Sequence, residues 1–147
     1  MNRHDTVRLE LEFERMISQS RELSLFKRSP TTWELLLLLA LDEGGGTDGV
    51  YNTIEAVKTR YLGNSAMLKF VRERRDDGLI QFREHQKKSK WSLKLNDDLH
   101  MQLFEVLIAR NQLLLARLKE DSNRYGNQAT DLESYRNAID SLKDRRG

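Results

Sequence analysis

The sequence predicts a mainly α-helical fold with one small β-hairpin. Most segments are rich in residues that favour helices and place their apolar residues three and four positions apart. Two short runs, Ile80 to His85 and Trp91 to Leu95, instead alternate apolar and polar residues around a polar turn, which predicts a hairpin. With 147 residues, the chain can form one compact domain, or a small domain with added dimerisation helices.

The composition excludes several classes of protein. Because the chain has no Cys, it can hold no disulfide, thiol nucleophile or thiolate metal site. Its longest apolar run, Leu35 to Leu41, is too short to span a membrane, and nothing in the sequence resembles a signal peptide. We therefore expect a cytoplasmic protein with no membrane partner. No catalytic motif is present, so we also expect that the protein is not an enzyme and has no cofactor.

Positive charge is concentrated in one stretch, although the net charge is only +2. Residues 58–94 contain eleven Lys or Arg against four Asp or Glu, whereas residues 1–57 and 95–147 are both net negative. A localised basic patch on a nearly neutral protein is typical of a polyanion binder. We therefore expect the binding surface to lie within residues 58–94.

The first segment, residues 5–26, is predicted to be one helix. Its alternating start would also suit a strand, but Leu9, Phe13 and Met16 form a helical stripe among good helix formers. Such a helix would expose too much apolar surface alone, so we expect it to have a partner.

A second helix is predicted after Ser29-Pro30, which breaks the chain. Thr31 and Glu34 have the spacing of a capping box. In such a box the Thr31 hydroxyl accepts from the backbone N–H of Glu34, and the Glu34 side chain accepts from the backbone N–H of Thr31. The helix then contains Leu35 to Leu41 and is apolar on all sides. We therefore expect it to be a buried scaffold helix.

A glycine-rich loop, Gly44 to Gly49, precedes a helix predicted from Val50 to Tyr61. The spacing of the glycines argues against a phosphate-binding loop, as does the lack of a following Lys-Ser/Thr pair. Leu62-Gly63 is expected to be a tight turn, with Gly63 as the C-cap of that helix. A helix, a glycine turn and a further helix at this spacing form the signature of a helix-turn-helix.

The helix after this turn, Asn64 to Asp77, has two distinct faces. Met67, Phe70 and Val71 fall at helical spacing and should face a core. The opposite row is small, polar and cationic, and consists of Ser65, Lys69, Arg72 and Asp76. Such a helix suits the major groove of DNA, where Lys and Arg reach guanine or phosphate. An ordinary amphipathic surface helix would have the same pattern.

The predicted hairpin follows Gly78-Leu79-Ile80 and is basic at its tip. The tip contains three lysines with no neighbouring carboxylate, namely Lys87, Lys88 and Lys90. A helix, a Gly-Leu-Ile connection and a basic hairpin follow one another in the order of a winged helix-turn-helix. This order favours DNA binding over the ordinary surface helix.

Two further helices are predicted after the hairpin. Asn96-Asp97-Asp98 should cap a long helix that reaches about Lys119 or Asp121 and carries apolar residues on more than one face. One subunit cannot hide all of that surface, so we expect the helix to pack against a copy of itself. After a break at 124–128, the capping box Thr130 to Glu133 should open the last helix.

This layout resembles the multiple-antibiotic-resistance-regulator (MarR) family of bacterial transcription factors. The residues that carry the resemblance are Thr32-Trp33-Glu34-Leu35-Leu36, Tyr61-Leu62-Gly63-Asn64-Ser65 and Phe70 to Ile80. The resemblance implies a homodimer with residues 1–28 as an N-terminal dimerisation helix and residues 29–96 as the winged helix-turn-helix domain. Residues 97–147 would be the C-terminal dimerisation helices.

Two positions depart from the family pattern. The wing lacks the usual Asp-x-Arg element, so we expect phosphate contacts there and no insertion into the minor groove. Arg74 stands four residues before Gly78, where the family usually has Leu. We expect Arg74 to snorkel or to pair with an acidic neighbour.

The hypothesis is a homodimeric, sequence-specific regulator that binds double-stranded DNA. Base contacts are expected from Asn64, Ser65, Lys69 and Arg72, and phosphate contacts from Arg75, Arg83, Lys87, Lys88 and Lys90. The resemblance also implies a small aromatic or phenolic effector where the dimer helices meet the winged domain. Candidate linings of that effector site are Met16, Trp33 and His100.

Other readings of the same residues stay open. The winged domain could be a protein-interaction adaptor whose basic face meets an acidic partner, or a module for RNA or replication origins. Asp97, Asp98 and His100 could be imagined as metal ligands, but a solvated helix start with a capping Asp explains them better. We therefore expect no metal site.

Overall fold

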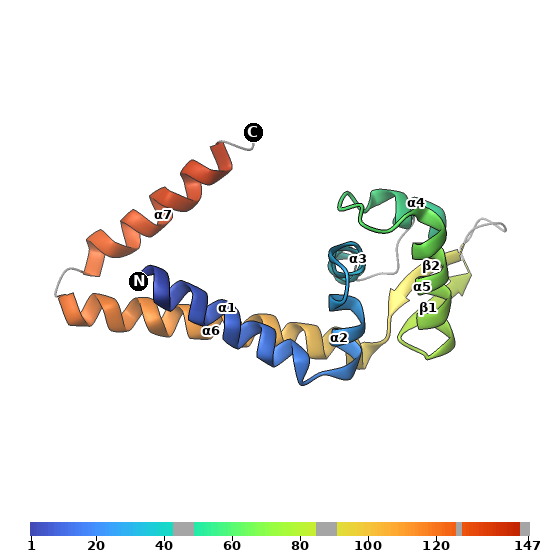
Figure 1. Ribbon diagram of the computed structural model, residues 1–147, viewed down its shortest axis with the longest axis horizontal. Coiled ribbons are helices and arrows are strands. Elements are labelled where there is room, and N and C mark those ends of the chain that lie inside the picture. The colour runs from blue at the N-terminus through green and yellow to red at the C-terminus, as the bar shows by residue number, and fades with distance from the viewer. Residues whose placement is uncertain (43–48, 85–90, 126–127, 145–147) are drawn as a thin grey trace. The chain divides into compact units, whose positions relative to one another are not determined.

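A computed structural model describes residues 1–42, 49–84, 91–125 and 128–144, and the fold is mainly α-helical with one two-stranded antiparallel hairpin, as predicted (Figure 1). The elements are α1 (Arg3–Ser18), α2 (Arg21–Lys27), α3 (Pro30–Leu41), α4 (Val50–Ala56), α5 (Asn64–Asp76), β1 (Ile80–Glu84), β2 (Trp91–Leu95), α6 (Asp97–Tyr125) and α7 (Gln128–Asp144). The chain forms two compact units, which divide it within α1 and α6. One unit contains residues 1–14 and 106–147, and the other contains residues 15–105.

The predicted single helix over residues 5–26 is wrong, because the structure has two helices there. The chain leaves the helical conformation at Ser20, where φ is −99° and ψ is 117°. The Ser20 hydroxyl accepts a hydrogen bond from the backbone N–H of Leu23 at 3.1 Å. Ser is among the preferred N-cap residues, so Ser20 starts a new helix where the apolar stripe alone predicted continuity.

The predicted capping box at the start of α3 is also wrong. The N-cap is Ser29, whose hydroxyl accepts from the backbone N–H of Thr31 at 3.2 Å, and Pro30 occupies the first helical position. Thr31 and Glu34 accept hydrogen bonds from the backbone of residues 58–62. These two side chains therefore hold a distant segment of the chain in place.

The helix predicted from Val50 to Tyr61 ends five residues early, at Ala56. The carboxylate of Glu34 accepts from the backbone N–H groups of Lys58 and Thr59, and the Thr31 hydroxyl accepts from those of Tyr61 and Leu62. Because these N–H groups bond to α3, they cannot continue the hydrogen bonds of α4. The segment 57–63 is therefore a fixed, non-helical connection.

Gly63 is the N-cap of α5 and not the C-cap of the helix before it, so the predicted C-cap is wrong. Its φ of −76° and ψ of 171° are extended, and it is the N-cap of α5. Gly78, at the other end of α5, has a φ of 82°. The backbone N–H of Gly78 donates to the carbonyl of Arg75 at 3.0 Å, and that of Leu79 donates to the carbonyl of Arg74 at 2.8 Å. These two bonds form a Schellman motif.

The predicted hairpin is confirmed, and α5 leads directly into it. Ile80 pairs with Leu95 and Phe82 pairs with Leu93. Their side chains are buried or half-buried, whereas Gln81 and Arg83, which alternate with Ile80 and Phe82 along β1, are exposed. The Asn96 side chain donates to the carbonyl of Gly78 at 3.0 Å and joins the far end of β2 to the turn after α5.

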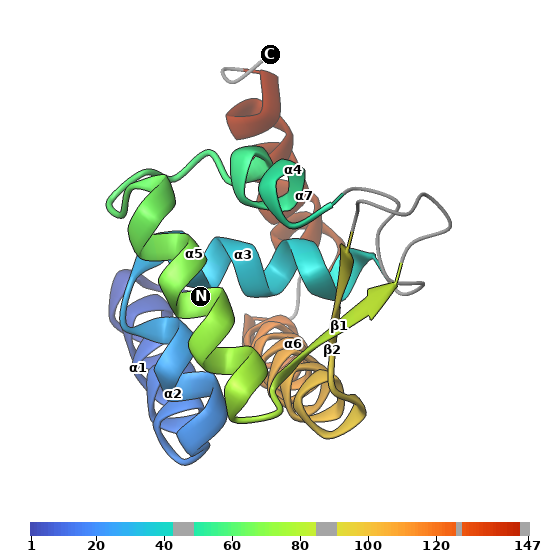
Figure 2. The same ribbon diagram turned by 90° about the vertical axis from the view of Figure 1, so that its right-hand side faces the viewer.

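The core of residues 15–105 lies among α2, α3, α5 and the hairpin. In Figure 2, α3 crosses behind α5 toward the hairpin, and α3 packs against both α2 and β2. Fully or almost fully buried side chains include Phe26, Leu35, Leu36, Ile54, Met67, Val71, Ile80, Leu93, Leu95 and Leu99. The predicted scaffold helix is therefore buried along most of its length, although Leu41 at its end is 81% exposed.

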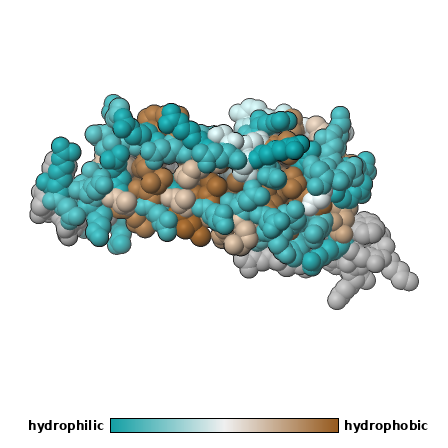
Figure 3. Space-filling model, turned by 90° about the horizontal axis from the view of Figure 1, so that it is seen from below, coloured by the Kyte–Doolittle hydropathy of each residue, from teal (hydrophilic) through white to brown (hydrophobic). Residues whose placement is uncertain are grey.

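The other unit consists of residues 1–14, residues 106–125 of α6, and α7. Within it, Arg117 pairs with Asp5 at 3.7 Å, and the Arg110 guanidinium lies 4.7 Å from the centre of the Phe13 ring. Hydrophobic side chains remain on its surface, as the brown residues in Figure 3 illustrate. They include Val7, Leu11, Ile108, Leu115 and Leu142, with Val7 at 69% and Leu115 at 63% exposure.

Both helices of the C-terminal region extend beyond their predicted ends. The long helix reaches Tyr125 because neither Gly nor Pro interrupts it before Gly126. The last helix begins at Gln128, and Thr130 lies inside it, so the predicted capping box there is wrong. Gln128 and Ala129 are good helix formers, which explains the earlier start. None of the described helices is both long enough and apolar enough to cross a membrane.

Candidate nucleic-acid interface

The two predicted faces of α5 are confirmed. Met67 and Val71 are completely buried, and the half-buried ring of Phe70 meets Phe26 edge-on, with 5.2 Å between ring centres. The row on the other side is exposed throughout and consists of Ser65, Lys69, Arg72 and Asp76. Asn64 and Arg75 are exposed as well. The packing of one side of α5 against the core therefore presents a polar and cationic side to the outside.

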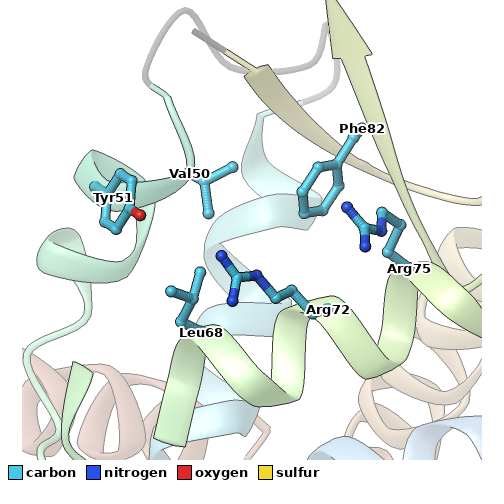
Figure 4. Close-up of a pocket in the computed structure, with 6 residues that line it drawn as sticks. All are labelled: Val50, Tyr51, Leu68, Arg72, Arg75 and Phe82. Atoms are coloured by element: carbon cyan, nitrogen blue, oxygen red, sulfur yellow. The ribbon is translucent and has the colours of Figure 1, made fainter. Parts of the chain in front are cut away.

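A cavity of about 500 Å³ lies beside this side of α5. Its walls come from α4, α5 and β1, and it is lined by Val50, Tyr51, Leu68, Arg72, Arg75 and Phe82. Figure 4 shows the Arg72 and Arg75 side chains extending from α5 into this space, with Tyr51 and Phe82 on opposite sides of it. Two guanidinium groups thus stand over apolar and aromatic walls, an arrangement that can hold an anionic group.

Arg75 is positioned by an aromatic ring from the hairpin. Its guanidinium carbon lies 4.8 Å from the centre of the Phe82 ring, which is within the range of a cation–π interaction. Its Nε is also 3.6 Å from the carboxylate of Asp76, but both side chains are largely exposed. An exposed ion pair of this kind contributes little, so the charge of Arg75 remains usable by a ligand.

Lys69 and Arg72 differ in their surroundings. Lys69 Nζ lies 3.9 Å from a carboxylate oxygen of Glu73, one turn further along α5, and the Lys69 side chain is 79% exposed. In the described part of the chain, Arg72 has no carboxylate within ion-pair distance. Of the cations on α5, Arg72 is therefore the one whose charge is least offset by its neighbours.

Arg74 was expected to snorkel or to pair with an acidic neighbour, and its contacts agree with this expectation. Its Nε donates to Asp77 at 2.8 Å, and its guanidinium carbon lies 4.9 Å from the centre of the Phe70 ring. The side chain is only 13% exposed. Arg74 therefore packs along the core and pairs with an acidic neighbour, so it is not available to a ligand.

Arg60 connects the end of α4 to the start of α5, and sequence reasoning missed it. One of its terminal nitrogens, Nη2, donates to the carbonyls of Ile54 at 3.0 Å and Glu55 at 3.2 Å. The other, Nη1, donates to Asn64 Oδ1 at 2.7 Å and lies 3.6 Å from Met67 Sδ. The sequence contained one signal for this role. Arg60 stands after the last turn of α4 and four residues before Asn64, and an Arg near the end of a helix can donate to its last carbonyls.

The hairpin contributes two described cations, Arg83 in β1 and Lys94 in β2, and Lys94 Nζ lies 3.6 Å from the carboxylate of Asp97. The Phe82 side chain is on the face of the hairpin that turns toward α5, so the neighbouring Arg83 side chain is on the outer face. Arg83 therefore does not line the cavity with Arg72 and Arg75. The predicted phosphate contacts Lys87, Lys88 and Lys90 lie outside the described residues.

The candidate effector residues have contacts with other neighbours. Lys27 Nζ lies 4.9 Å from the centre of the Trp33 ring, and His100 stacks on Phe104 with 5.0 Å between ring centres. Met16 is half-buried in α1. The effector site at Met16, Trp33 and His100 stays a prediction. Among the described residues, no group of three His, Asp or Glu could hold a metal ion.

Comparisons of the sequence with protein-family models and with curated proteins found no match. The likeness to the MarR family therefore remains an expectation, and the geometry of α5 and its surroundings is the main evidence on function.

Proposed function

We propose that residues 15–105 form a winged helix-turn-helix that binds double-stranded DNA in a sequence-specific manner. In this proposal α4 and α5 are the helix-turn-helix, β1 and β2 form the wing, and α5 enters the major groove. The observation that carries the proposal is the exposed side of α5, where Arg72 and Arg75 flank a cavity while Met67 and Val71 anchor the helix in the core. A rigidly held helix with outward cations suits both base and phosphate contacts.

The proposed contacts follow from the positions of the side chains. Asn64, Ser65, Lys69 and Arg72 would meet base edges, because they lie along the exposed row or at the start of α5. Arg75 and Arg83 would meet phosphates on the two sides of the hairpin, together with the lysines of its tip. The high positive charge of residues 58–94 supports this arrangement.

We further propose that the protein acts as a homodimeric transcriptional regulator of MarR-like layout in the cytoplasm. The exposed apolar side chains of residues 1–14 and 106–147, which include Val7, Leu11, Ile108 and Leu115, support a second copy as the partner. A two-fold dimer would bind a near-palindrome whose half-sites are about 10 base pairs apart. A small aromatic effector would act on this dimer.

The test is a titration of labelled duplex DNA of random sequence, followed by fluorescence anisotropy over a series of salt concentrations. We expect log affinity to fall linearly with log salt, by about 0.9 for each phosphate contact. A triple variant with Arg72, Arg75 and Arg83 changed to Gln should lose most of this affinity. The matched control changes the exposed cations Arg8, Lys119 and Arg136 of the other unit to Gln and should retain it.

Two outcomes would contradict the proposal. Duplex binding that is absent at low salt would favour the adaptor, because an adaptor needs no affinity for DNA. Equal competition by double-stranded RNA would favour an RNA module, since the major groove of A-form RNA is too narrow for a helix.

A further inference from the structure

The contact between Arg60 and Asn64 restricts what Asn64 can recognise. Arg60 is fixed at three points, because its guanidinium donates to the carbonyls of Ile54 and Glu55 as well as to Asn64 Oδ1. Two of these acceptors belong to the backbone at the end of α4. The direction of the guanidinium is therefore set by the fold and does not depend on Asn64.

A guanidinium group has donors only, so it determines which way the Asn64 amide faces. An amide carries an oxygen that accepts and a nitrogen that donates, and only the oxygen can face Arg60. The 2.7 Å distance from Arg60 Nη1 to Asn64 Oδ1 is that of a strong charge-assisted bond. The amide nitrogen, Nδ2, is left as the polar atom for an outside ligand.

The position of Asn64 makes this restriction relevant to recognition. Asn64 is the first residue of α5, and its side chain is exposed. Within the described residues, no acceptor is bonded to its Nδ2, and the N-cap Gly63 has no side chain that could cover it. The amide therefore presents donors at the end of α5 that would lead into the groove.

We propose that Arg60 is a positioning residue that makes Asn64 select guanine over adenine in the bound DNA. Guanine presents two acceptors, N7 and O6, in the major groove, which suit a group that only donates. Adenine presents an acceptor beside a donor, and Asn normally pairs with it through both amide atoms. With its oxygen held by Arg60, Asn64 cannot form that second bond. This inference depends on the proposed DNA binding.

The experiment is a selection of bound duplexes from a random pool, carried out with the full chain and read out as base preference at every position. The Asn64→Ala variant identifies the position that Asn64 reads, because only that position should lose its preference. At this position the unchanged protein should favour guanine over adenine by at least about fivefold.

Arg60→Ala should shift the preference at that one position from guanine toward adenine, since the freed amide can then use both its atoms. Arg60→Lys should keep guanine, because an ammonium group is also a donor only. Lys58→Ala is the matched control, since it removes one exposed positive charge from the same connection without touching Asn64. It should lower affinity for all sequences equally.

A second variant keeps the inference testable if Arg60→Ala is poorly folded, as judged by circular dichroism. Asn64→Asp can still accept from Arg60 but has no N–H to donate, so it should lose the guanine preference. The inference is overturned if Arg60→Ala folds and leaves the preference unchanged, or if Asn64→Ala alters no position. These outcomes leave DNA binding itself intact. If the unchanged protein binds no duplex, the proposed function fails first.

Discussion

Arg75 of α5 and Phe82 of β1 form a contact that joins the two parts of the candidate interface. The Arg75 guanidinium carbon lies 4.8 Å from the centre of the Phe82 ring, and both residues line the same cavity. A cation on a long side chain normally samples many rotamers, and an aromatic face beside it reduces that freedom. Phe82 therefore has a role in holding Arg75 as well as in packing the hairpin.

Phe82→Leu should reveal this role through its coupling to Arg75. Leu keeps an apolar group at a half-buried position but offers no ring face, so about 0.5–1 kcal/mol of interaction with Arg75 should be lost. A double-mutant cycle with Arg75→Ala, measured by urea denaturation, should show this coupling. Phe82→Tyr is the control, because it retains the ring. Strictly additive effects of the two changes would contradict the contact.

Arg72→Ala and Arg83→Ala should weaken DNA binding in different ways. Arg72 is proposed to meet a base edge, so its loss should cost about 1–3 kcal/mol and relax the preference at one position. Arg83 is proposed to meet a phosphate, so its loss should weaken binding to all sequences and reduce the salt slope by about 1. Anisotropy titrations with the selected duplex and with a random duplex separate the two effects. Identical behaviour of the two variants would contradict the assignment.

Local patterns in the sequence were sufficient to predict the faces of α5 and the hairpin. The spacing of Met67, Phe70 and Val71 depends only on the period of a helix, and alternation in β1 and β2 depends only on the period of a strand. Both patterns act over a few residues. The exposed row with Lys69 and Arg72 could be predicted for the same reason.

Contacts between distant segments could not be predicted in this way. Thr31 and Glu34 have the spacing of a capping box, but the structure pairs them with residues 58–62. The sequence separation of these partners is more than twenty residues, and a local pattern contains no information about it. Arg60 was missed for a different reason. Its partners are only four to six residues away, but the helix was predicted to continue to Tyr61, whereas α4 ends at Ala56.

Glu34→Ala should destabilise the fold, because two backbone N–H groups at residues 58 and 59 would lose their acceptor. The N–H of Thr59 is half-buried and that of Lys58 is exposed, so the loss of the shared acceptor should cost about 1–2 kcal/mol. Glu34→Gln should recover part of this, since its amide oxygen can still accept. Urea denaturation of both variants, with the exposed Glu105→Ala in α6 as control, provides the measurement. If Glu34→Ala is as stable as the control, these hydrogen bonds are unimportant.

The two glycines that flank α5 should respond in opposite directions to substitution. Gly78 has a φ of 82°, so Gly78→Ala forces a side chain into the left-handed region and should cost about 1–2 kcal/mol. Gly63 has an extended backbone, and the space that a Cβ atom would occupy there is open. Gly63→Ser should therefore stabilise the protein by about 0.5–1 kcal/mol, through a better N-cap and a less flexible unfolded chain.

Thermal unfolding followed by circular dichroism measures both glycine variants under the same conditions. A loss of stability in Gly63→Ser would mean that the start of α5 tolerates no side chain, against the open space observed around Gly63. A neutral Gly78→Ala would mean that the turn after α5 can adopt another conformation.

Leu115→Glu should dissociate the proposed homodimer. Leu115 is 63% exposed on α6, and burial of such a side chain against a second copy would contribute about 1.5–3 kcal/mol. A carboxylate in that position would instead have to be desolvated, so the dimer should weaken strongly. Ala116→Glu is the matched control, because Ala116 is exposed and lies about 100° further round the helix. Sedimentation velocity at several protein concentrations measures the effect. A monomeric unchanged protein would contradict the dimer, and a Leu115→Glu variant that stays dimeric would place the contact on a different face of α6.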